Sequence, residues 1–229
     1  LQFFRSLKNF PQVERMDQKT AFDVVNWDFM FRVLKDFNIS EKLLKLLRSF
    51  YKPNFVRSTV MVNGFLCKPF YIYRGLRQGC PLSPLLYVII AETLCNKIRS
   101  DSKISGIFLG AEEIRLNCYA DDINFFLSDV VSLDRVFELL EHYGTASGAI
   151  LNLDKTQILT LGNCENLPLK YCSKEIEKIK IYGIFFNKTG FDAKTSFKSA
   201  EESIQKLNNI LPHSNFSLES KSIFINTYF

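Results

Sequence analysis

The first regular pattern along the chain is a pair of helix-like segments between residues 27 and 53. Apolar residues three or four positions apart predict the first helix, at Trp27, Phe31, Leu34 and Phe37. Ser40 can cap a second helix, and Pro53 would end it. The apolar side of the second helix comprises Leu43, Leu44, Leu47, Phe50 and Tyr51. We expect the two helices to form a hairpin that packs on a sheet.

A β-hairpin is expected next. Residues 56–62 (VRSTVMV) are rich in β-branched side chains, which favour strands. Asn63-Gly64 supplies the positive φ angles that a tight turn requires, and residues 65–66 and 70–72 resume the strand-like pattern. The segment therefore predicts two antiparallel strands joined at Asn63-Gly64.

A loop and a helix follow this hairpin. Residues 74–84 (RGLRQGCPLSP) contain too many Gly and Pro residues for a regular element. Pro84 suits the first turn of a helix, because its missing N–H is unsatisfied there in any case. We expect this helix to continue to about Arg99.

Residues 114–128 (IRLNCYADDINFFLS) alternate on both sides of a polar centre, which predicts a hairpin with Asp121-Asp122 at its turn. Later patterns predict a helix at about 132–146, strands at 157–161 and 179–186, and helices at about 193–211 and 217–229. Strands and helices interleave with local hairpins, so the expected fold class is α+β.

Composition fits a folded protein with an anionic partner but does not identify that partner. The 229 residues are 47% hydrophobic and 23% charged, which excludes a disordered or collagen-like chain. The net charge of +5 is compatible with nucleic acid and equally with many other enzymes. The longest apolar run, residues 85–91, is far shorter than a membrane span, and no signal peptide opens the chain.

The cysteines give no metal-binding pattern. Their positions are 67, 80, 95, 118, 164 and 172, none forms a C-x₂-C pair, and only His142 and His213 accompany them. Reduced cysteines in an intracellular protein are the simpler interpretation. Because the chain begins at Leu1 and stops at Phe229 inside an apolar pattern, we expect it to be a piece of a longer protein.

The Asp121-Asp122 pair is the first feature that indicates chemistry. Two adjacent carboxylates repel each other unless a cation occupies the site. Asp is also common in solvated turns, so the pair alone leaves both interpretations open.

Several segments together resemble the catalytic motifs of reverse transcriptases. Residues 119–122 (YADD) resemble motif C, residues 17–23 (DQKTAFD) resemble motif A, and residues 74–84 resemble motif B. Residues 148–156 (GAILNLDKT) and 181–184 (IYGI) are similar to motifs D and E. The order of the motifs matches a polymerase palm, and the pattern is similar to the reverse transcriptases of LINE-type (non-LTR) retrotransposons.

The resemblance implies a right-hand polymerase palm, an antiparallel sheet with helices packed on one face, plus partial fingers and the start of a helical thumb. It covers about residues 17–229 and extends to residues 63–66 and, at the start of the thumb, 220–226. We expect residues 1–190 to form the palm with partial fingers and residues 191–229 to begin the thumb.

The resemblance also implies the site. Its catalytic residues would be Asp17, Asp121, Asp122 and Lys155, and the three aspartates would bind Mg²⁺, or Mn²⁺ in its place. Two such ions hold the attacking hydroxyl, the phosphate and the leaving pyrophosphate, and Mg²⁺ prefers oxygen ligands. Lys155 would protonate the pyrophosphate as a general acid. An exposed loop acid at position 17 and a surface lysine at position 155 are the alternatives.

Other motif residues would contact nucleotide or nucleic acid. Phe22, Gln78 and Gly79 would lie at the nucleotide, with Phe22 excluding a 2′-hydroxyl so that the product is DNA. Contacts to nucleic acid would come from Arg74, Arg77 and Gly183. For Phe22 the alternative is simple core packing, and for the two arginines it is solvation in a loop.

The chain departs from the family in four respects. The strand entering motif A, residues 11–16 (PQVERM), is polar and poorly β-forming. The residues before it do not match the expected fingers. Motif E has Tyr182 where a leucine is expected, and neither an endonuclease segment nor a cysteine–histidine knuckle is present.

The resemblance predicts RNA-templated addition of deoxynucleotides to a DNA 3′-end. Expected partners are an RNA template, a DNA primer and deoxynucleoside triphosphates, with no membrane and a nuclear location. Two alternatives remain open: a degenerate remnant that catalyses nothing, and the palm of a group II intron or retron reverse transcriptase. Oligomeric state, template specificity and independent folding do not follow from the sequence.

Overall fold

The computed structural model describes residues 12–16, 18–19, 21–119, 122–160, 176–188, 190–210 and 217. The expected helix at 217–229 and the poorly matching segment at 1–11 lie outside these ranges, apart from Ser217. Helices and antiparallel strands alternate along the chain, so the expected α+β class is confirmed.

A four-stranded antiparallel sheet in the order β12-β1-β10-β9 forms the centre of the molecule. Its strands are β1 (Gln12–Met16), β9 (Leu116–Tyr119), β10 (Asp122–Leu127) and β12 (Gln157–Thr160). The predicted hairpin is confirmed, because β9 and β10 pair. Asp122 is the first residue of β10, opposite Tyr119, rather than part of the turn as predicted. The predicted strand at 157–161 is confirmed over Gln157–Thr160, and residue 161 lies outside the described residues.

The polar segment before motif A forms a strand although its side chains are poorly β-forming. β1 lies between β10 and β12 and pairs with both over most of its length. Backbone hydrogen bonds to two neighbours override the weak strand propensity of its side chains.

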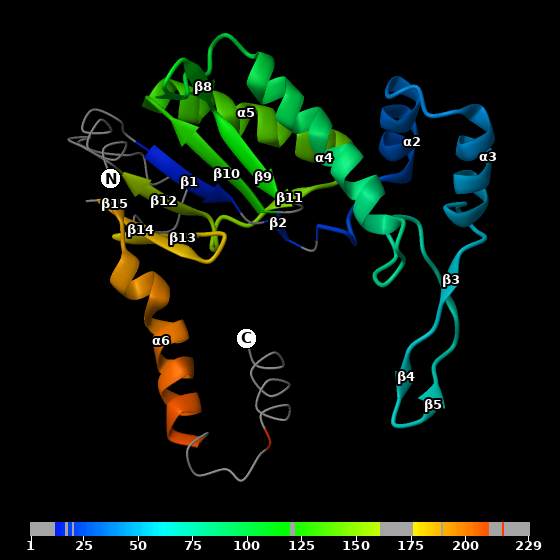
Figure 1. Cartoon of the computed structure of the whole chain (residues 1–229). Coiled ribbons are helices and arrows are strands. Elements are labelled where there is room, and N and C mark those ends of the chain that lie inside the picture. Colours follow the sequence, from blue (N-terminus) through cyan, green and yellow to red (C-terminus); the bar gives the residue numbers. More distant parts are fainter. Residues whose placement is uncertain are drawn as a thin grey trace.

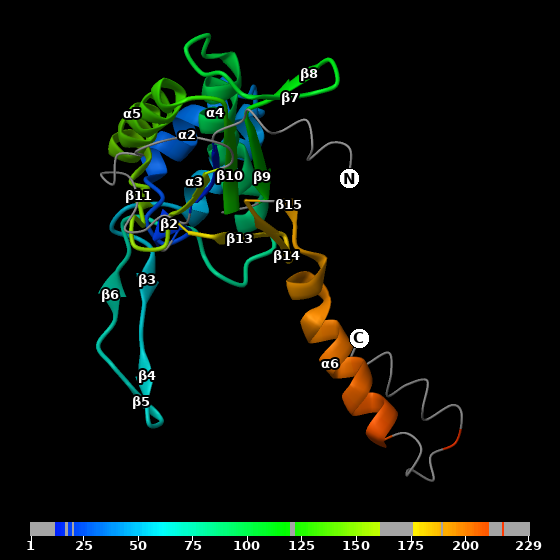
Figure 2. The same cartoon turned by 90° about the vertical axis from the view of Figure 1, so that its left-hand side faces the viewer.

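Two long helices cover one face of this sheet (Figures 1 and 2). They are α4 (Ser83–Ser100) and α5 (Val130–Ser147), and both match predicted helices. Leu94 and Ile98 of α4 and Val136 of α5 pack with Ile123 and Phe125 of β10 in one buried cluster. Each such side chain contributes about 1.5–3 kcal/mol by leaving water, which makes this cluster the main support of the sheet.

The predicted helix pair is present as α2 (Trp27–Asp36) and α3 (Glu41–Phe50). Ser40 caps α3 as expected, since its side chain accepts a hydrogen bond from Leu43 N. The pair does not pack on the sheet, contrary to expectation. Its buried residues, including Met30 and Leu44, join Leu86 and Ile90 of α4 in a second cluster, to the right of the sheet in Figure 1. The helix pair therefore packs against the first half of α4, which extends beyond the sheet, and not against the sheet itself.

A long β-ribbon leads from α3 to α4 and projects from the molecule (Figures 1 and 2). Its strands are β3 (Arg57–Ser58), β4 (Met61–Val62), β5 (Phe65–Leu66) and β6 (Phe70–Tyr71), with β3 pairing β6 and β4 pairing β5. The predicted turn is confirmed, since Asn63 and Gly64 have φ angles of 50° and 83°. Both faces of the ribbon tip are exposed.

A short hairpin, β7 (Ile107–Leu109) with β8 (Glu112–Ile114), precedes the central hairpin. Ile114 therefore belongs to a different strand pair from Leu116, and the single alternating strand expected from residue 114 is divided at Arg115. The Arg115 guanidinium is bound to the carbonyls of Arg99 and Asp101 and to Glu113, which bends the chain between the two hairpins.

The stretch at 179–186 is a hairpin rather than one strand. Its strands are β13 (Lys178–Ile181) and β14 (Ile184–Asn187), and β15 (Gly190–Phe191) adds a third. Tyr182 and Gly183 both have positive φ, 48° and 87°, which reverses the chain between the strands. The strand-like pattern of apolar residues continues through Tyr182 and Gly183, so the sequence did not reveal the turn.

Three elements complete the fold. β2 (Gln18–Lys19) pairs with β11 (Ile150–Leu151) just beyond the central sheet. The predicted helix at 193–211 is α6 (Ala193–Ile210), which extends away from the sheet in both views (Figures 1 and 2).

Candidate active site at the end of the central sheet

Asp122 stands at one end of the sheet, where three strands meet. It is half-buried and lies opposite Tyr119, the last residue of β9. Met16, the last residue of β1, lies opposite Ile123. Asp17 follows Met16 in the sequence and Asp121 precedes Asp122, but both lie outside the described residues.

The turn of the β13–β14 hairpin reaches this end of the sheet. The Tyr182 ring meets the Tyr119 ring edge to face, with centroids 5.8 Å apart. Burial raises the pKa of the Tyr182 phenol, and the nearby charge of Asp122 adds to this effect. Motif E therefore contacts motif C through two aromatic rings. The predicted contact residue Gly183 is exposed in the same turn.

The segment after motif A is joined to the motif B loop by backbone hydrogen bonds. Gly75 N donates to Val25 O at 2.8 Å, and Leu76 N donates to Phe22 O at 2.7 Å. Trp27 adds a buried hydrogen bond from its indole Nε1 to Gly75 O at 2.8 Å. These three contacts hold the two motifs at a set distance, and sequence reasoning did not anticipate the role of Trp27.

Gly75 is the residue that permits this close approach. Its φ is +90°, and a Cβ atom built there would lie 2.6 Å from Asp23 O. No larger residue fits without moving the backbone, because real Cβ atoms do not come this close to another heavy atom. The glycine-rich pattern at 74–79 was the available signal, but it did not single out this position.

Phe22 is half-buried beside the Gly75 loop. Its ring stacks on the buried Tyr87 of α4, with centroids 4.8 Å apart and an interplanar angle of 19°. The ring is therefore held by core packing on one side and remains partly exposed. This arrangement is compatible with both interpretations of Phe22, and its role at a sugar stays a prediction.

The motif B loop presents its polar side chains to solvent. Gln78 Nε2 donates to Asp23 Oδ1 at 3.1 Å, which links motifs A and B a second time. Gly79 is exposed, with no heavy atom within 4 Å of a Cβ built on it. Arg74, Arg77 and Gln78 line a cavity of about 680 Å³ that also reaches Trp27 and the base of the ribbon.

Lys155 lies in the turn between β11 and β12 and is exposed. Its backbone N–H donates to Asn152 O at 3.1 Å, so the turn itself is well defined. This places the motif D lysine on the strand-connecting segment next to β12. Its proposed general-acid role is not tested by these contacts.

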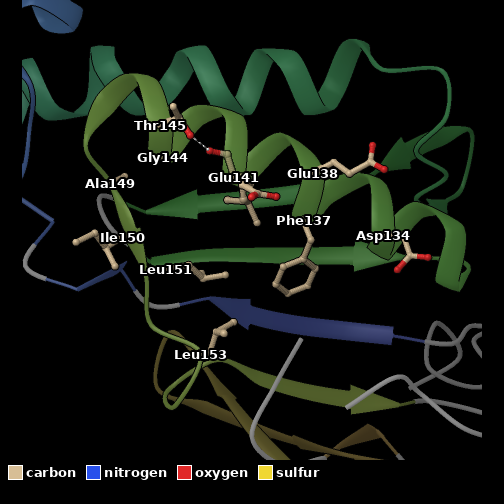
Figure 3. A pocket seen from close by; sticks show the side chains of 11 residues that line it. Asp134, Phe137, Glu138, Glu141, Gly144, Thr145, Ala149, Ile150, Leu151 and Leu153 are labelled. Carbon is tan, nitrogen blue, oxygen red and sulfur yellow. Dashed lines mark hydrogen bonds between the residues drawn. The ribbon is translucent and has the colours of Figure 1, made fainter. Parts of the chain in front are cut away.

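A second cavity, of about 480 Å³, lies along α5 and is not suited to a nucleotide (Figure 3). Figure 3 shows Phe137 of α5 directed toward Leu151, so the floor is apolar. The charged residues that line this cavity, Asp134, Glu138 and Glu141, are all acidic. Phosphate groups would be repelled there, whereas the 680 Å³ cavity carries arginines.

No cluster of three or more His, Cys, Asp or Glu side chains that could hold a metal occurs within the described ranges. Since Asp17 and Asp121 lie outside those ranges, the expected trio of aspartates remains a prediction. Asp122 alone is described, with carboxylate oxygen donors of the type that Mg²⁺ prefers.

Comparison with protein families identifies the family of this chain. Residues 8–209 match the family model described as reverse transcriptase (RNA-dependent DNA polymerase). The chain belongs to the reverse transcriptase family. The match includes all of the sequence motifs from A to E, and the predicted palm fold is confirmed. Members of this family generally use divalent metal ions.

Curated relatives of this reverse transcriptase chain come from retrotransposons. It is 30% identical over 195 residues to the transposon TX1 uncharacterized 149 kDa protein of Xenopus laevis, covering 82% of this chain and 15% of that protein. It is 27% identical over 153 residues to a Pol polyprotein of the type-1 retrotransposable element R2 of Popillia japonica, covering 66% and 21%. These relatives confirm the LINE-type (non-LTR) resemblance. The chain spans only a small part of their length.

Solved structures of low sequence identity share the fold. A telomerase from Candida albicans, solved with a fragment of telomeric RNA, superposes with a TM-score of 0.59 at 15% identity, covering 85% of this chain and 33% of that one. Apo telomerase from Candida tropicalis lacking its C-terminal domain gives 0.58 at 18% identity, covering 83% and 38%. The reverse transcriptase palm is thus recovered from three-dimensional similarity as well as from sequence. Across the described helices, none is both long and apolar enough to span a bilayer.

Proposed function

We propose that this chain is the RNA-directed DNA polymerase palm of a non-LTR retrotransposon protein. The observation that carries the proposal is that the fold joins distant motifs in pairs, motif A with motif B and motif C with motif E. Leu76 N donates to Phe22 O and so joins motif B to motif A, and the Tyr119–Tyr182 contact joins motif C to motif E. These segments lie far apart in the sequence, so the fold alone brings them together.

We propose that Asp17, Asp121 and Asp122 hold divalent magnesium. The register supports this assignment, because Met16, which precedes Asp17 in the sequence, lies opposite Ile123, which follows Asp122 in the sequence. Carboxylate oxygens suit Mg²⁺, so the residue types fit the ion. When bound, Mg²⁺ would neutralise phosphate charge and lower the pKa of the attacking 3′-hydroxyl.

The motif A and B side chains would position the incoming nucleotide. The partly exposed Phe22 ring, braced by Tyr87, would exclude a 2′-hydroxyl by shape. The Gln78–Asp23 hydrogen bond would hold the loop, so that Gly79 can approach the templating base with no side chain in between. Arg74 and Arg77 would bind phosphates through charge-assisted hydrogen bonds.

Lys155 would donate a proton to the departing pyrophosphate. Its position on an ordered turn and its exposure support this role, since a general acid must reach the leaving group. We further propose that residues 1–190 form the palm with partial fingers and that the thumb begins at 191. The projection of α6 from the sheet supports that division (Figure 1).

Primer extension tests the proposal. The chain, a DNA primer annealed to an RNA template, deoxynucleoside triphosphates and Mg²⁺ should give extended primer, and Asp121→Asn should abolish extension. Glu112→Gln is a matched control, because it also replaces a carboxylate by an amide, at an exposed position on β8. A folded wild-type chain that extends no primer would contradict the proposal and support a degenerate remnant.

We also propose a nuclear location, which rests on the retrotransposon resemblance alone. A fluorescent fusion of the full-length protein, imaged in cells, should concentrate in the nucleus. Uniform cytoplasmic fluorescence would contradict this part of the proposal.

A further inference from the structure

The charges of the chain are segregated along its sequence. Residues 42–91 contain eight Lys or Arg residues and no Asp or Glu, a formal charge of +8. Since the whole chain carries +5, the remaining residues together carry −3. A one-sided distribution of this kind is typical of a surface that binds a polyanion.

The fold gathers this acid-free segment at one side of the molecule. It includes most of α3, the ribbon β3–β6, the motif B loop and the first half of α4, to the right in Figure 1. All eight basic side chains are exposed. The positive charge therefore lies on the surface, where a ligand can reach it, and is not buried in the core.

Three of these cations share the 680 Å³ cavity between the ribbon base and the motif B loop, namely Arg57, Arg74 and Arg77. Within the described residues, none of the three forms an ion pair with a carboxylate. Asp23 is the one acid in the lining, and its Oδ1 already accepts a hydrogen bond from Gln78. The cavity therefore favours an anion such as a phosphodiester.

Arg57 is held in position by its cross-strand partner. It lies opposite Tyr71, its guanidinium carbon is 4.8 Å from the Tyr71 ring centroid, and its Nη2 donates to Tyr71 Oη at 2.7 Å. A guanidinium fixed by stacking loses less conformational freedom when it binds a phosphate. Motif comparison does not include Arg57, so it is an additional candidate.

Beyond the cavity, the ribbon exposes aromatic rings without acidic neighbours. Phe65 at the tip is 80% exposed, Tyr73 56% and Phe70 49%. Exposed rings next to cations are the usual platform for unpaired bases, whereas the bases of a duplex are already stacked on one another. The chemistry of the ribbon therefore favours a single strand over a duplex.

We propose that the ribbon β3–β6 and Arg57 bind the single-stranded RNA template before it is copied. Phosphates occupy the cavity lined by Arg57, Arg74 and Arg77, and bases stack on the ribbon, with Phe65 as the outermost ring. This inference rests on the proposed polymerase function for the identity of the strand. The binding surface itself depends only on charge, exposure and the cavity.

Equilibrium binding of a fluorescein-labelled oligouridylate in EDTA, without primer or nucleotide, tests the proposal. Arg57→Gln should weaken binding and reduce the slope of log K against log salt by about 0.7, the value for one lost phosphate contact on a single strand. Arg77→Gln, which has no Tyr71 contact to lose, should give a similar reduction. Lys103→Gln removes one charge at an exposed position outside the segment and should change neither quantity.

The ribbon tip needs a separate variant. Phe65→Ser should weaken binding by about 5- to 150-fold, the range for one stacked base, while leaving the salt slope unchanged. Because Phe65 is exposed, Phe65→Ser should leave the fold intact, and circular dichroism checks this. Duplex RNA should bind less tightly than the single strand.

Two results would overturn the inference. If Arg57→Gln and Lys103→Gln have equal effects, the surface is only generally basic. If neither Arg57→Gln nor Phe65→Ser changes the affinity for RNA, the exposed ribbon binds another partner, such as a protein. Binding in EDTA is measured without catalysis, and primer extension with Mg²⁺ is measured separately. A chain that gives either result and still extends primers would support the proposed polymerase function and contradict only the template surface.

Discussion

The rings of Tyr119 and Tyr182 meet edge to face at 5.8 Å, with 71° between their planes. Tyr119 ends β9, shortly before the Asp121-Asp122 pair in the sequence, and Tyr182 begins the turn between β13 and β14. The contact spans more than sixty residues of sequence and fixes the motif E turn beside Asp122. The sequence has Tyr182 where a leucine was expected, and in the structure the Tyr182 ring packs against the Tyr119 ring.

Tyr182→Ala should detach the motif E turn from the sheet end. Aromatic pairs contribute about 0.5–1.5 kcal/mol, and these two exposed rings should contribute near the lower limit. We therefore expect a loss of about 0.5 kcal/mol in urea unfolding and a raised KM for the primer terminus. Tyr182→Phe keeps the ring and should behave like the wild type. Equal losses in both variants would show that the hydroxyl matters and the ring contact does not.

Gly75→Ala should destabilise the chain strongly. The new Cβ would lie 2.6 Å from Asp23 O at a positive φ. Strain and overpacking together should cost about 2–4 kcal/mol in urea unfolding. Gly110→Ala is the matched control, because Gly110 also has positive φ but has open space around a built Cβ, and it should cost only about 1 kcal/mol. Equal costs would contradict the close approach of motifs A and B.

Local sequence chemistry predicted the individual elements well. Ser40 as a cap, Asn63-Gly64 as a turn and Pro84 at the start of α4 each act within a few residues, so their effects are readable from sequence. The hairpin carrying Asp122 was predicted for the same reason.

Long-range contacts were not predictable from local pattern. β1 is polar yet central, because pairing with β10 and β12 decides its conformation. The helices α2 and α3 pack on α4, because α4 extends beyond the sheet. Within the site, the sequence motifs predicted the candidate residues. The structural roles of Trp27 and Gly75 became apparent only from the hydrogen bonds between distant segments.

Phe22→Val should relax sugar selection in an active chain. The smaller side chain leaves room for a 2′-hydroxyl, so use of ribonucleotides relative to deoxynucleotides should rise by about 10- to 200-fold. Phe29→Val is the control, because Phe29 is also half-buried against the same core and packs on Tyr143. It should lose comparable stability without a change in selectivity. Unchanged selectivity in an active Phe22→Val chain would assign Phe22 to core packing.

Asp192 should give a pH-dependent contribution to the attachment of α6. Hydrogen bonds from Lys178 Nζ and from Thr195 hold the pKa of the Asp192 carboxyl well below its usual range. A lowered folded-state pKa means that the carboxylate stabilises the fold above the unfolded value of about 3.9, and that this stabilisation is lost as pH falls further. Urea unfolding should separate wild type from Asp192→Asn at pH 7, with the gap narrowing below about pH 4.

Glu201→Gln, at an exposed position on α6, is the control for that series. Its difference from the wild type should be small at both pH values. A gap between wild type and Asp192→Asn that stays constant as pH falls would contradict the role of the Asp192 carboxylate.

The central claim is that Asp17, Asp121 and Asp122 together hold a divalent ion at the end of the sheet. Electron paramagnetic resonance of Mn²⁺ titrated into the chain measures this binding without requiring catalysis. We expect wild type and Glu112→Gln to bind Mn²⁺ alike, and Asp17→Asn or Asp121→Asn to bind it more than about tenfold less tightly. Without metal, Asp121→Asn should be at least as stable as wild type, because a like-charge repulsion is removed. Undiminished Mn²⁺ binding by folded Asp17→Asn and Asp121→Asn chains would contradict the claim.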